Sequence, residues 1–122
     1  MADRILIADD DADVCSLMTY VLESAGYEVF ICNNGRNVID MVKAEYVKLL
    51  ILDVMLPGID GYNIVKKMSD DADVKEVPIL VVSALEASKN LFQPFMNVSK
   101  FISKPFNNEE LVEDVKAALG QS

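Results

Sequence analysis

The sequence predicts an α/β fold, a doubly wound parallel sheet of five strands with helices on both faces. Short apolar runs alternate five times with amphipathic stretches along the 122 residues, and this alternation is typical of parallel strands joined by crossover helices. The runs at Arg4–Ala8, Lys48–Leu52 and Ile79–Ser83 are almost continuously apolar, as are strands that are buried on both faces. No linker divides the chain, so we expect a single domain over residues 1–122.

Two further strands are predicted at Glu28–Cys32 and Lys100–Ser103, from their shorter apolar runs. The helix between the first two strands is indicated by apolar residues spaced three and four apart from Val14 to Ala25. Gly26 follows this helix as a natural stop, because glycine readily adopts the left-handed conformation found at helix ends.

Three more helical segments are predicted, two of them from weaker patterns. These two run from about Arg36 to Glu45 and from Asp60 to Ser69. The last helix begins with the letters NNEELV. We expect Asn107 to cap this helix and Glu110 to reach back and complete a capping box.

The composition excludes several classes of function. The chain has no histidine, and its two cysteines, Cys15 and Cys32, lack metal-like spacing; this excludes a zinc site and any catalytic pair that uses histidine. We expect both cysteines to be buried, reduced thiols. The net charge of −9 would repel nucleic acid and suits a protein that gathers cations. With no membrane-length apolar run and no signal-peptide pattern, we expect a cytoplasmic protein without membrane contact.

The pentamer DDADV occurs twice, at Asp10–Val14 and at Asp70–Val74. The first copy directly follows a predicted buried strand and leads into a helix, so it lies at the carboxyl end of that strand. Ligands of open α/β sheets bind at this edge. The second copy follows a helix and precedes the strand at Ile79–Ser83, which places it at the opposite edge. We therefore predict a functional site at the first copy and a solvated acidic loop at the second.

Other predicted strands also end in polar residues, at the same edge of the sheet as the first copy. If the first strand lies beside the third, Asp9 and Asp10 come close to Asp53, and Ser83 and Lys104 flank them. Three carboxylates in one cleft repel one another unless a cation lies between them, and ligands that are all oxygens suit Mg²⁺. A carboxylate beside a cation, a hydroxyl and an ammonium group is also the arrangement that phosphoryl transfer requires.

The segments ILIADDD, LLILDVMLPGIDGY, PILVVSA and FISKPF, in this order, resemble the receiver domain of response regulators in two-component signalling. The similarity extends from Arg4 to about Leu119. It implies the flavodoxin-like strand order 2-1-3-4-5, which is the order found in this family's chemotaxis regulators. It also implies a signalling domain rather than an enzyme, because such a domain catalyses only its own phosphorylation and dephosphorylation.

The resemblance implies a role for each residue at this edge of the sheet, here called the acidic edge (Asp9, Asp10, Asp53, Ser83 and Lys104). Asp53 would accept the phosphoryl group. Asp10 would bind Mg²⁺ directly and Asp9 largely through water, while the Met55 carbonyl completes the metal ligands. The phosphoryl donor would be a histidine kinase or a phosphotransfer protein.

A second set of residues would, by the same resemblance, respond to phosphorylation. Ser83 stands where the family carries a hydroxyl that contacts the phosphoryl group, and Lys104 is the lysine of a Lys-Pro pair whose peptide bond is expected to be cis. Phe101 occupies the position of the switch aromatic. The loop after the acceptor would be shaped by three residues, Pro57, Gly58 and Gly61.

The segment EASKNLFQPFMNVSKF departs from the family pattern. Pro94 stands where the fourth helix would normally continue, so we expect this helix to end or kink there. Leu91, Phe92, Phe95 and Met96 add apolar residues near the helix 4 to helix 5 face, through which receivers usually contact an output partner or effector domain. Packing into the core and exposure to a partner are both open for these side chains.

Three other functions are less consistent with the sequence. A flavodoxin-like carrier of FMN needs a phosphate loop after the first strand, where the acidic DDDADV segment would repel phosphate. A phosphatase of the haloacid dehalogenase type expects an acid two residues after its nucleophile, and that position is Met55. A calcium loop starting at Asp9 would have Val14 at its turn glycine and Tyr20 at its bidentate glutamate.

Overall fold

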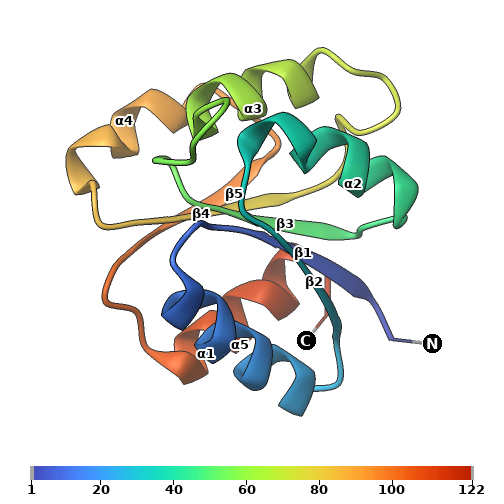
Figure 1. Cartoon of the computed structure of the whole chain (residues 1–122), viewed down its shortest axis with the longest axis vertical. Coiled ribbons are helices and arrows are strands. Elements are labelled where there is room, and N and C mark those ends of the chain that lie inside the picture. The colour runs from blue at the N-terminus through green and yellow to red at the C-terminus, as the bar shows by residue number, and fades with distance from the viewer. Residues whose placement is uncertain (1, 122) are drawn as a thin grey trace.

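The computed structural model describes residues 2–121 and contains the predicted five-stranded sheet. Its strands lie in the order β2-β1-β3-β4-β5, and every neighbouring pair is parallel. The fold class and the strand order are therefore confirmed (Figure 1). The strand bounds are β1 Arg4–Ala8, β2 Glu28–Cys32, β3 Leu49–Leu52, β4 Ile79–Ser83 and β5 Val98–Ser103.

Helices cover both faces of the sheet, as Figure 1 shows. On one face lie α1 (Ala12–Ser24) and α5 (Asn108–Ala118); on the other lie α2 (Val38–Ala44), α3 (Gly61–Ser69) and the single turn α4 (Lys89–Phe92). Short 3₁₀ turns precede α2 and α4, at Gly35–Asn37 and Glu86–Ser88. Within residues 2–121, no helix is both long and apolar enough to cross a membrane.

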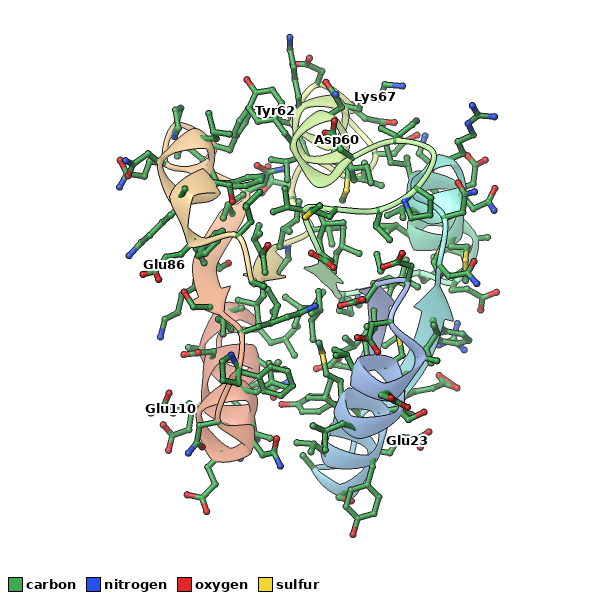
Figure 2. All side chains as sticks on the ribbon, turned by 60° about the vertical axis from the view of Figure 1, so that its left-hand side comes forward. Glu23, Asp60, Tyr62, Lys67, Glu86 and Glu110 are labelled. Carbon is green, nitrogen blue, oxygen red and sulfur yellow. The ribbon has the colours of Figure 1, made fainter. Side chains whose placement is uncertain are left out.

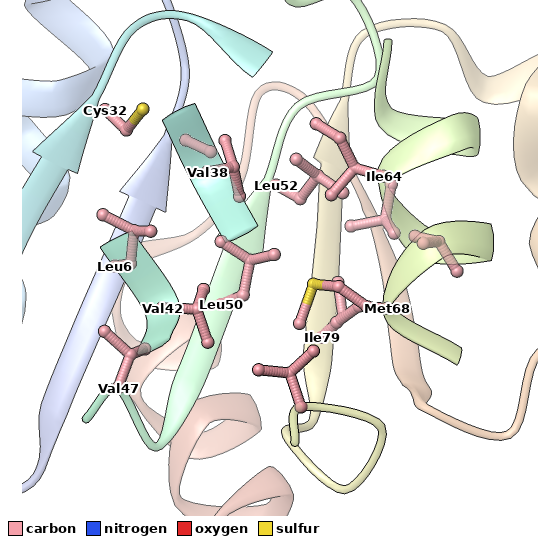
Figure 3. Close-up of a cluster of buried hydrophobic side chains, with 14 of the residues drawn as sticks. Leu6, Cys32, Val38, Val42, Val47, Leu50, Leu52, Ile64, Met68 and Ile79 are labelled. Carbon is pink, nitrogen blue, oxygen red and sulfur yellow. The ribbon is translucent and has the colours of Figure 1, made fainter. Parts of the chain in front are cut away.

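The sheet separates two hydrophobic cores, and successive residues of one strand enter different cores. In β1, Leu6 and Ala8 belong to the core under α2 to α4, whereas Ile5 and Ile7 belong to the core under α1 and α5. Figure 3 shows part of the first core, where side chains from α2 and α3 pack onto the sheet. Burial on both faces is why the strand sequences are continuously apolar instead of alternating.

The edge strand β5 begins earlier than the sequence analysis predicted. Val98 pairs with Ile79 and Lys100 pairs with Leu80, so Ser99 is an extra residue at a register shift. A strand with one open edge can accommodate such a bulge. Because Ser99 and Lys100 are exposed, the start of β5 does not have the apolar run on which the prediction depended.

Two helices start differently from the way the sequence predicted. The first turn of the stretch predicted from Arg36 is 3₁₀, and the Asn34 side chain accepts the N–H of Arg36 (2.9 Å). Asn107 caps α5 by accepting the N–H groups of Glu109 and Glu110. The expected return bond from the Glu110 carboxylate is absent among the described residues, so Asn107 acts as a one-sided cap.

The unusual segment before β5 divides between core and surface. Helix α4 ends at Phe92, two residues before Pro94, as predicted. Phe92 is 2% exposed, and its ring lies 6.3 Å from that of Tyr62 and 6.2 Å from that of Phe101. In contrast, Leu91 remains 54% exposed. The aromatic contacts hold a helix of only one turn, which has too few hydrogen bonds to be stable alone.

We expect Phe92→Ala to lower the free energy of unfolding by about 3–5 kcal/mol, because it leaves a cavity among packed aromatic rings. Its neighbour Leu91 is a matched control, and Leu91→Ala should change stability by only about 0.5 kcal/mol, as surface substitutions do. Urea titrations followed by circular dichroism measure both values. Equal stabilities of the two variants would contradict the assignment of Phe92 as the anchor of α4.

Candidate functional site

The carboxyl ends of four strands bring together the polar residues singled out from the sequence. Asp9 follows β1, Asp53 follows β3, Ser83 is the last residue of β4 and Lys104 follows β5. The Lys104 Nζ lies 2.8 Å from Asp9 Oδ2 and 3.4 Å from Asp53 Oδ2. One ammonium group therefore bridges two carboxylates that come from neighbouring strands.

Asp9 is buried, and both of its carboxylate oxygens already have partners. Its Oδ1 accepts the N–H of Asp11 (2.9 Å), and its Oδ2 accepts from Lys104. Its own N–H donates to Cys32 O (3.1 Å), which extends the pairing of β1 with β2 beyond the end of the strand. Asp10 is exposed, so its carboxylate remains open to solvent and to an incoming ligand.

The Lys104 ammonium group is stabilised in its charged form. Burial by itself would lower the pKa of Lys104, but the hydrogen bond to Asp9 and the charges of Asp53 and Asp9 together raise it above its ordinary value. Lys104 therefore carries its positive charge throughout the physiological pH range. It neutralises part of the negative charge at this edge and supplies N–H donors to it.

Asp53 is half-buried and is fixed through its main chain. Its N–H donates to Ala8 O (2.9 Å), and its Oδ1 accepts the N–H of Met55 (3.3 Å). Asp9, Asp10 and Asp53 each place one carboxylate oxygen within 4.8 Å of the others. The ligand set consists of oxygens alone, so the cluster fits a hard divalent cation such as Mg²⁺.

Ser83 and Lys104 are linked through their main chains. The Lys104 N–H donates to Ser83 O (3.0 Å), and the Lys104–Pro105 peptide bond is cis, as predicted. The Ser83 hydroxyl is buried and accepts the N–H of Leu85 (3.0 Å). Its proton is therefore left to donate to a group that binds at the edge. Phe101 is half-buried and packs against the core beneath α4.

The first helix is capped by a residue that the sequence analysis did not single out. Asp11, rather than Asp9 or Asp10, accepts the N–H groups of Asp13 and Val14 and starts α1. Its own N–H orients the Asp9 carboxylate. The signal in the sequence was the third consecutive aspartate, which stands one turn before the apolar positions of the helix.

The two copies of DDADV make the same local turn in different surroundings. In each copy, the second aspartate accepts the N–H of the aspartate two residues later: Asp11 accepts from Asp13, and Asp71 accepts from Asp73. The second copy lies before β4, where Asp71 forms an ion pair with Lys43 of α2 (2.8 Å). The pentamer is thus a turn motif, and its position on the sheet decides whether it borders a site.

Cys15 lies directly beneath the acidic cluster, on the first turns of α1. Its thiol donates to Asp9 O (3.3 Å). Burial, together with the nearby charges of Asp9 and Asp11, raises the pKa of Cys15 to about 11, so the thiol stays protonated. Cys15 and Cys32 are both buried and unpaired, and the expectation of free thiols is confirmed.

The loop between Asp53 and α3 has the glycines that the resemblance suggested. Gly58 has a positive φ of 92°, a conformation that glycine adopts without steric cost. A Cβ on Gly61 would lie 2.8 Å from Val54 Cα, so Gly61 allows α3 to pack closely against the start of the loop. Asp60 caps α3 by accepting the N–H of Asn63, and Figure 2 shows Asp60 at the end of this helix.

Comparisons with known proteins agree with this arrangement. A family model, the response regulator receiver domain, matches residues 5–116. The "Probable transcriptional regulator ycf27" of Porphyra purpurea is 30% identical over 118 residues, which are 96% of this chain and 47% of that protein. The chain therefore spans about half the length of the curated relatives it matches.

Solved structures give the same result. A protein described as a response regulator from Chloroflexus aurantiacus has a TM-score of 0.92 at 32% identity, with 99% of this chain and 100% of that chain covered. The response regulator TrrA from Thermotoga maritima, solved with Mg²⁺ and BeF, has a TM-score of 0.85 at 27% identity, with 96% and 99% covered. From the family match and this shared architecture, the chain belongs to the response regulator receiver domains of two-component systems.

Proposed function

We propose that this receiver is a phosphorylation-dependent switch in which Asp53 accepts a phosphoryl group from a histidine kinase or a phosphotransfer protein. The observation that carries the proposal is the Lys104 bridge between Asp9 and Asp53 beside the open carboxylate of Asp10. Residues 1–122 would act as one receiver domain. It would serve signalling and would catalyse only the gain and loss of its own phosphoryl group.

In the proposed transfer, a carboxylate oxygen of Asp53 attacks the phosphorus atom. A new P–O bond forms, and the P–N bond to the donor histidine breaks; the imidazole keeps the electron pair and takes up a proton. The Lys104 ammonium and the Ser83 hydroxyl would donate to the phosphoryl oxygens. Both groups lie at the same sheet edge: the ammonium is held by the Asp9 and Asp53 carboxylates, and the hydroxyl accepts the Leu85 N–H, so both donors stand beside Asp53 before the reaction.

The same edge would hold Mg²⁺. Asp10 and Asp53 offer carboxylate oxygens, and the Met55 carbonyl stands on the loop that follows Asp53; Asp9, whose oxygens are engaged, would act through water. The bound ion would neutralise negative charge on the phosphoryl oxygens. The Mg²⁺ and BeF that accompany the Thermotoga maritima relative support this assignment.

We expect acetyl phosphate to label wild-type protein in the presence of Mg²⁺, with the phosphoryl group on Asp53 and acetate released. Asp53→Asn should lose the label because the amide is a poor nucleophile, and chelation of Mg²⁺ by EDTA should abolish labelling of the wild type. Phosphate-affinity electrophoresis and mass spectrometry measure both effects.

The matched control is Asp71→Asn, in the second pentamer at the opposite edge of the sheet. This variant should label like the wild type, because only its contact with Lys43 is lost. Wild-type labelling of Asp53→Asn would refute the acceptor assignment. Undiminished labelling in EDTA would refute the metal requirement alone.

The proposed switch connects Ser83 to Phe101. Movement of the Ser83 hydroxyl toward the phosphoryl group would open space beside β4 for the Phe101 ring, whose neighbour in β4 is Val81. Phe101 has no hydroxyl that could hold it in an outward position, and its ring already packs against Phe92. The two states would therefore differ little in energy, and the inactive state would be leaky.

Binding of beryllofluoride, which stands in for the phosphoryl group, should shift the amide resonances around Phe101 and Phe92 as well as those around Asp53. Two-dimensional NMR spectra of labelled protein record the shifts. The same addition to Asp53→Asn should leave the spectrum unchanged. Shifts that stop at the acidic edge would mean that the helix 4 to helix 5 face does not respond through Phe101.

The side chains beside the acceptor would protect the phosphorylated state from water. Met55 and Leu85 are 65% and 45% exposed, and each is held beside a site residue: the Met55 N–H donates to Asp53 Oδ1, and the Leu85 N–H donates to Ser83 Oγ. Both side chains are apolar. They would obstruct an attacking water and offer no group that orients or activates it.

We therefore expect a phosphorylated state that lasts many minutes, and we expect Met55→Asn and Leu85→Glu to shorten it. Release of inorganic phosphate after removal of the donor measures the lifetime. Met96→Asn is the matched control, since Met96 is fully exposed and lies before β5, away from the acidic edge. If neither polar replacement speeds hydrolysis, water exclusion by these side chains is not what sets the rate.

A further inference from the structure

The loop that carries Met55 is fixed at its two ends by hydrogen bonds within the site region. At its start, the Asp53 N–H donates to Ala8 O (2.9 Å). At its end, the Gly61 N–H donates to Val54 O (2.9 Å). Among the described residues, Pro57 to Ile59, in the outer part of the loop, make no main-chain hydrogen bond to the sheet.

The outer part of this loop rests on the turn that follows β2. The Gly35 N–H donates to Pro57 O (2.8 Å). Gly35 also lies against the Ile59 main chain: a Cβ on Gly35 would lie 1.8 Å from Ile59 O and 2.7 Å from Ile59 C. Both obstructing atoms belong to the backbone, so no side-chain rotation can make room. Only glycine fits between the two segments.

The turn after β2 is itself held rigidly. The Asn34 Oδ1 accepts a hydrogen bond from the N–H of Arg36 (2.9 Å), and the Asn34 main-chain carbonyl accepts one from the thiol of Cys32 (3.1 Å). Across the contact, a Cβ on Gly58 would lie 2.4 Å from Asn34 Oδ1. The two segments are therefore complementary at two glycines, Gly35 on one side and Gly58 on the other.

We propose that the Asn34–Gly35 turn positions the Met55 main chain, and that Gly35 is a positioning residue for the metal-dependent reaction at Asp53. This inference rests on the function proposed above. Mg²⁺ requires near-ideal octahedral geometry with short bonds to oxygen, so a small displacement of the loop weakens binding. A Cβ at position 35 would displace Pro57 and Ile59. Because the loop is fixed at Asp53 and Val54, the residues between the fixed end and the displaced part, Met55 among them, have to absorb the displacement.

The test compares Mg²⁺ binding by Gly35→Ala and by Gly26→Ala, with amide NMR shifts as the readout. Gly26 lies in the turn after α1 with a φ of 99°, and a Cβ there would meet no atom within 4 Å. Gly26→Ala therefore loses stability through its backbone conformation alone. We expect Gly35→Ala to bind Mg²⁺ about tenfold more weakly, as loss of outer support for metal ligands does, and Gly26→Ala to bind like the wild type.

Thermal unfolding of both variants separates positioning from general destabilisation. Wild-type Mg²⁺ affinity in Gly35→Ala, or an equal loss in both variants, would overturn the inference. If Gly35→Ala does not fold, Asn34→Ala decides: it removes the Oδ1 that meets Gly58 and Arg36, and it should weaken Mg²⁺ binding several-fold, whereas unchanged affinity would overturn the inference.

Failure of the proposed function has a different signature in the same titration. Absence of Mg²⁺-dependent shifts in the wild type, or shifts that persist unchanged in Asp10→Asn, would refute the metal site itself, and the role of Gly35 would fall with it. Normal binding by the wild type and loss in Asp10→Asn, without an effect of Gly35→Ala, would refute only the positioning role.

Discussion

The acidic edge depends on one interaction, the pairing of the Lys104 ammonium group with the Asp9 and Asp53 carboxylates. Asp9 is buried and Asp53 is half-buried, and two such carboxylates without a nearby cation would repel each other. Lys104 reaches both of them from the end of β5, although β4 lies between β5 and β3. Neighbouring strands are about 5 Å apart, so only a long side chain can make this contact across the sheet.

The parallel sheet explains why the polar groups Asp9, Asp53, Ser83 and Lys104 meet at one edge. Each strand that enters the sheet runs in the same direction, so the first residue after each strand emerges at the same side. Because the central strands β1, β3 and β4 are buried on both faces, their polar groups stand only at the strand ends. The fold thereby gathers charge from separate parts of the chain, and the loops beyond the strand ends determine how precisely it is held.

The repeated pentamer separates local structure from function. Both copies use their second aspartate to close the same short turn, which shows what five residues determine by themselves. In the first copy the preceding strand brings Asp9 under Lys104; in the second, the neighbouring helix brings Lys43 to Asp71. Asp9 is the residue just before the first copy, so the position of each pentamer in the fold, and not its own sequence, decides whether it borders the acidic edge.

The sequence by itself determined the fold class, the central strands and the residues at the acidic edge. Apolar runs locate strands that are buried on both faces, and the residue that ends each run is then placed by the shared direction of the strands. This is why Asp9, Asp53, Ser83 and Lys104 could be assigned to one edge from the order of residues alone.

Only the tertiary structure decided which aspartate caps α1, where β5 begins and what supports the loop after Asp53. Each of three consecutive aspartates can cap a helix, and Asp11 does so because Asp9 is still paired with β2 through Cys32 O. The start of β5 depends on a bulge against β4. The contact of Gly35 with Ile59 joins two loops that are distant in the chain, and no local pattern encodes it, because it arises from the packing of two loops against each other.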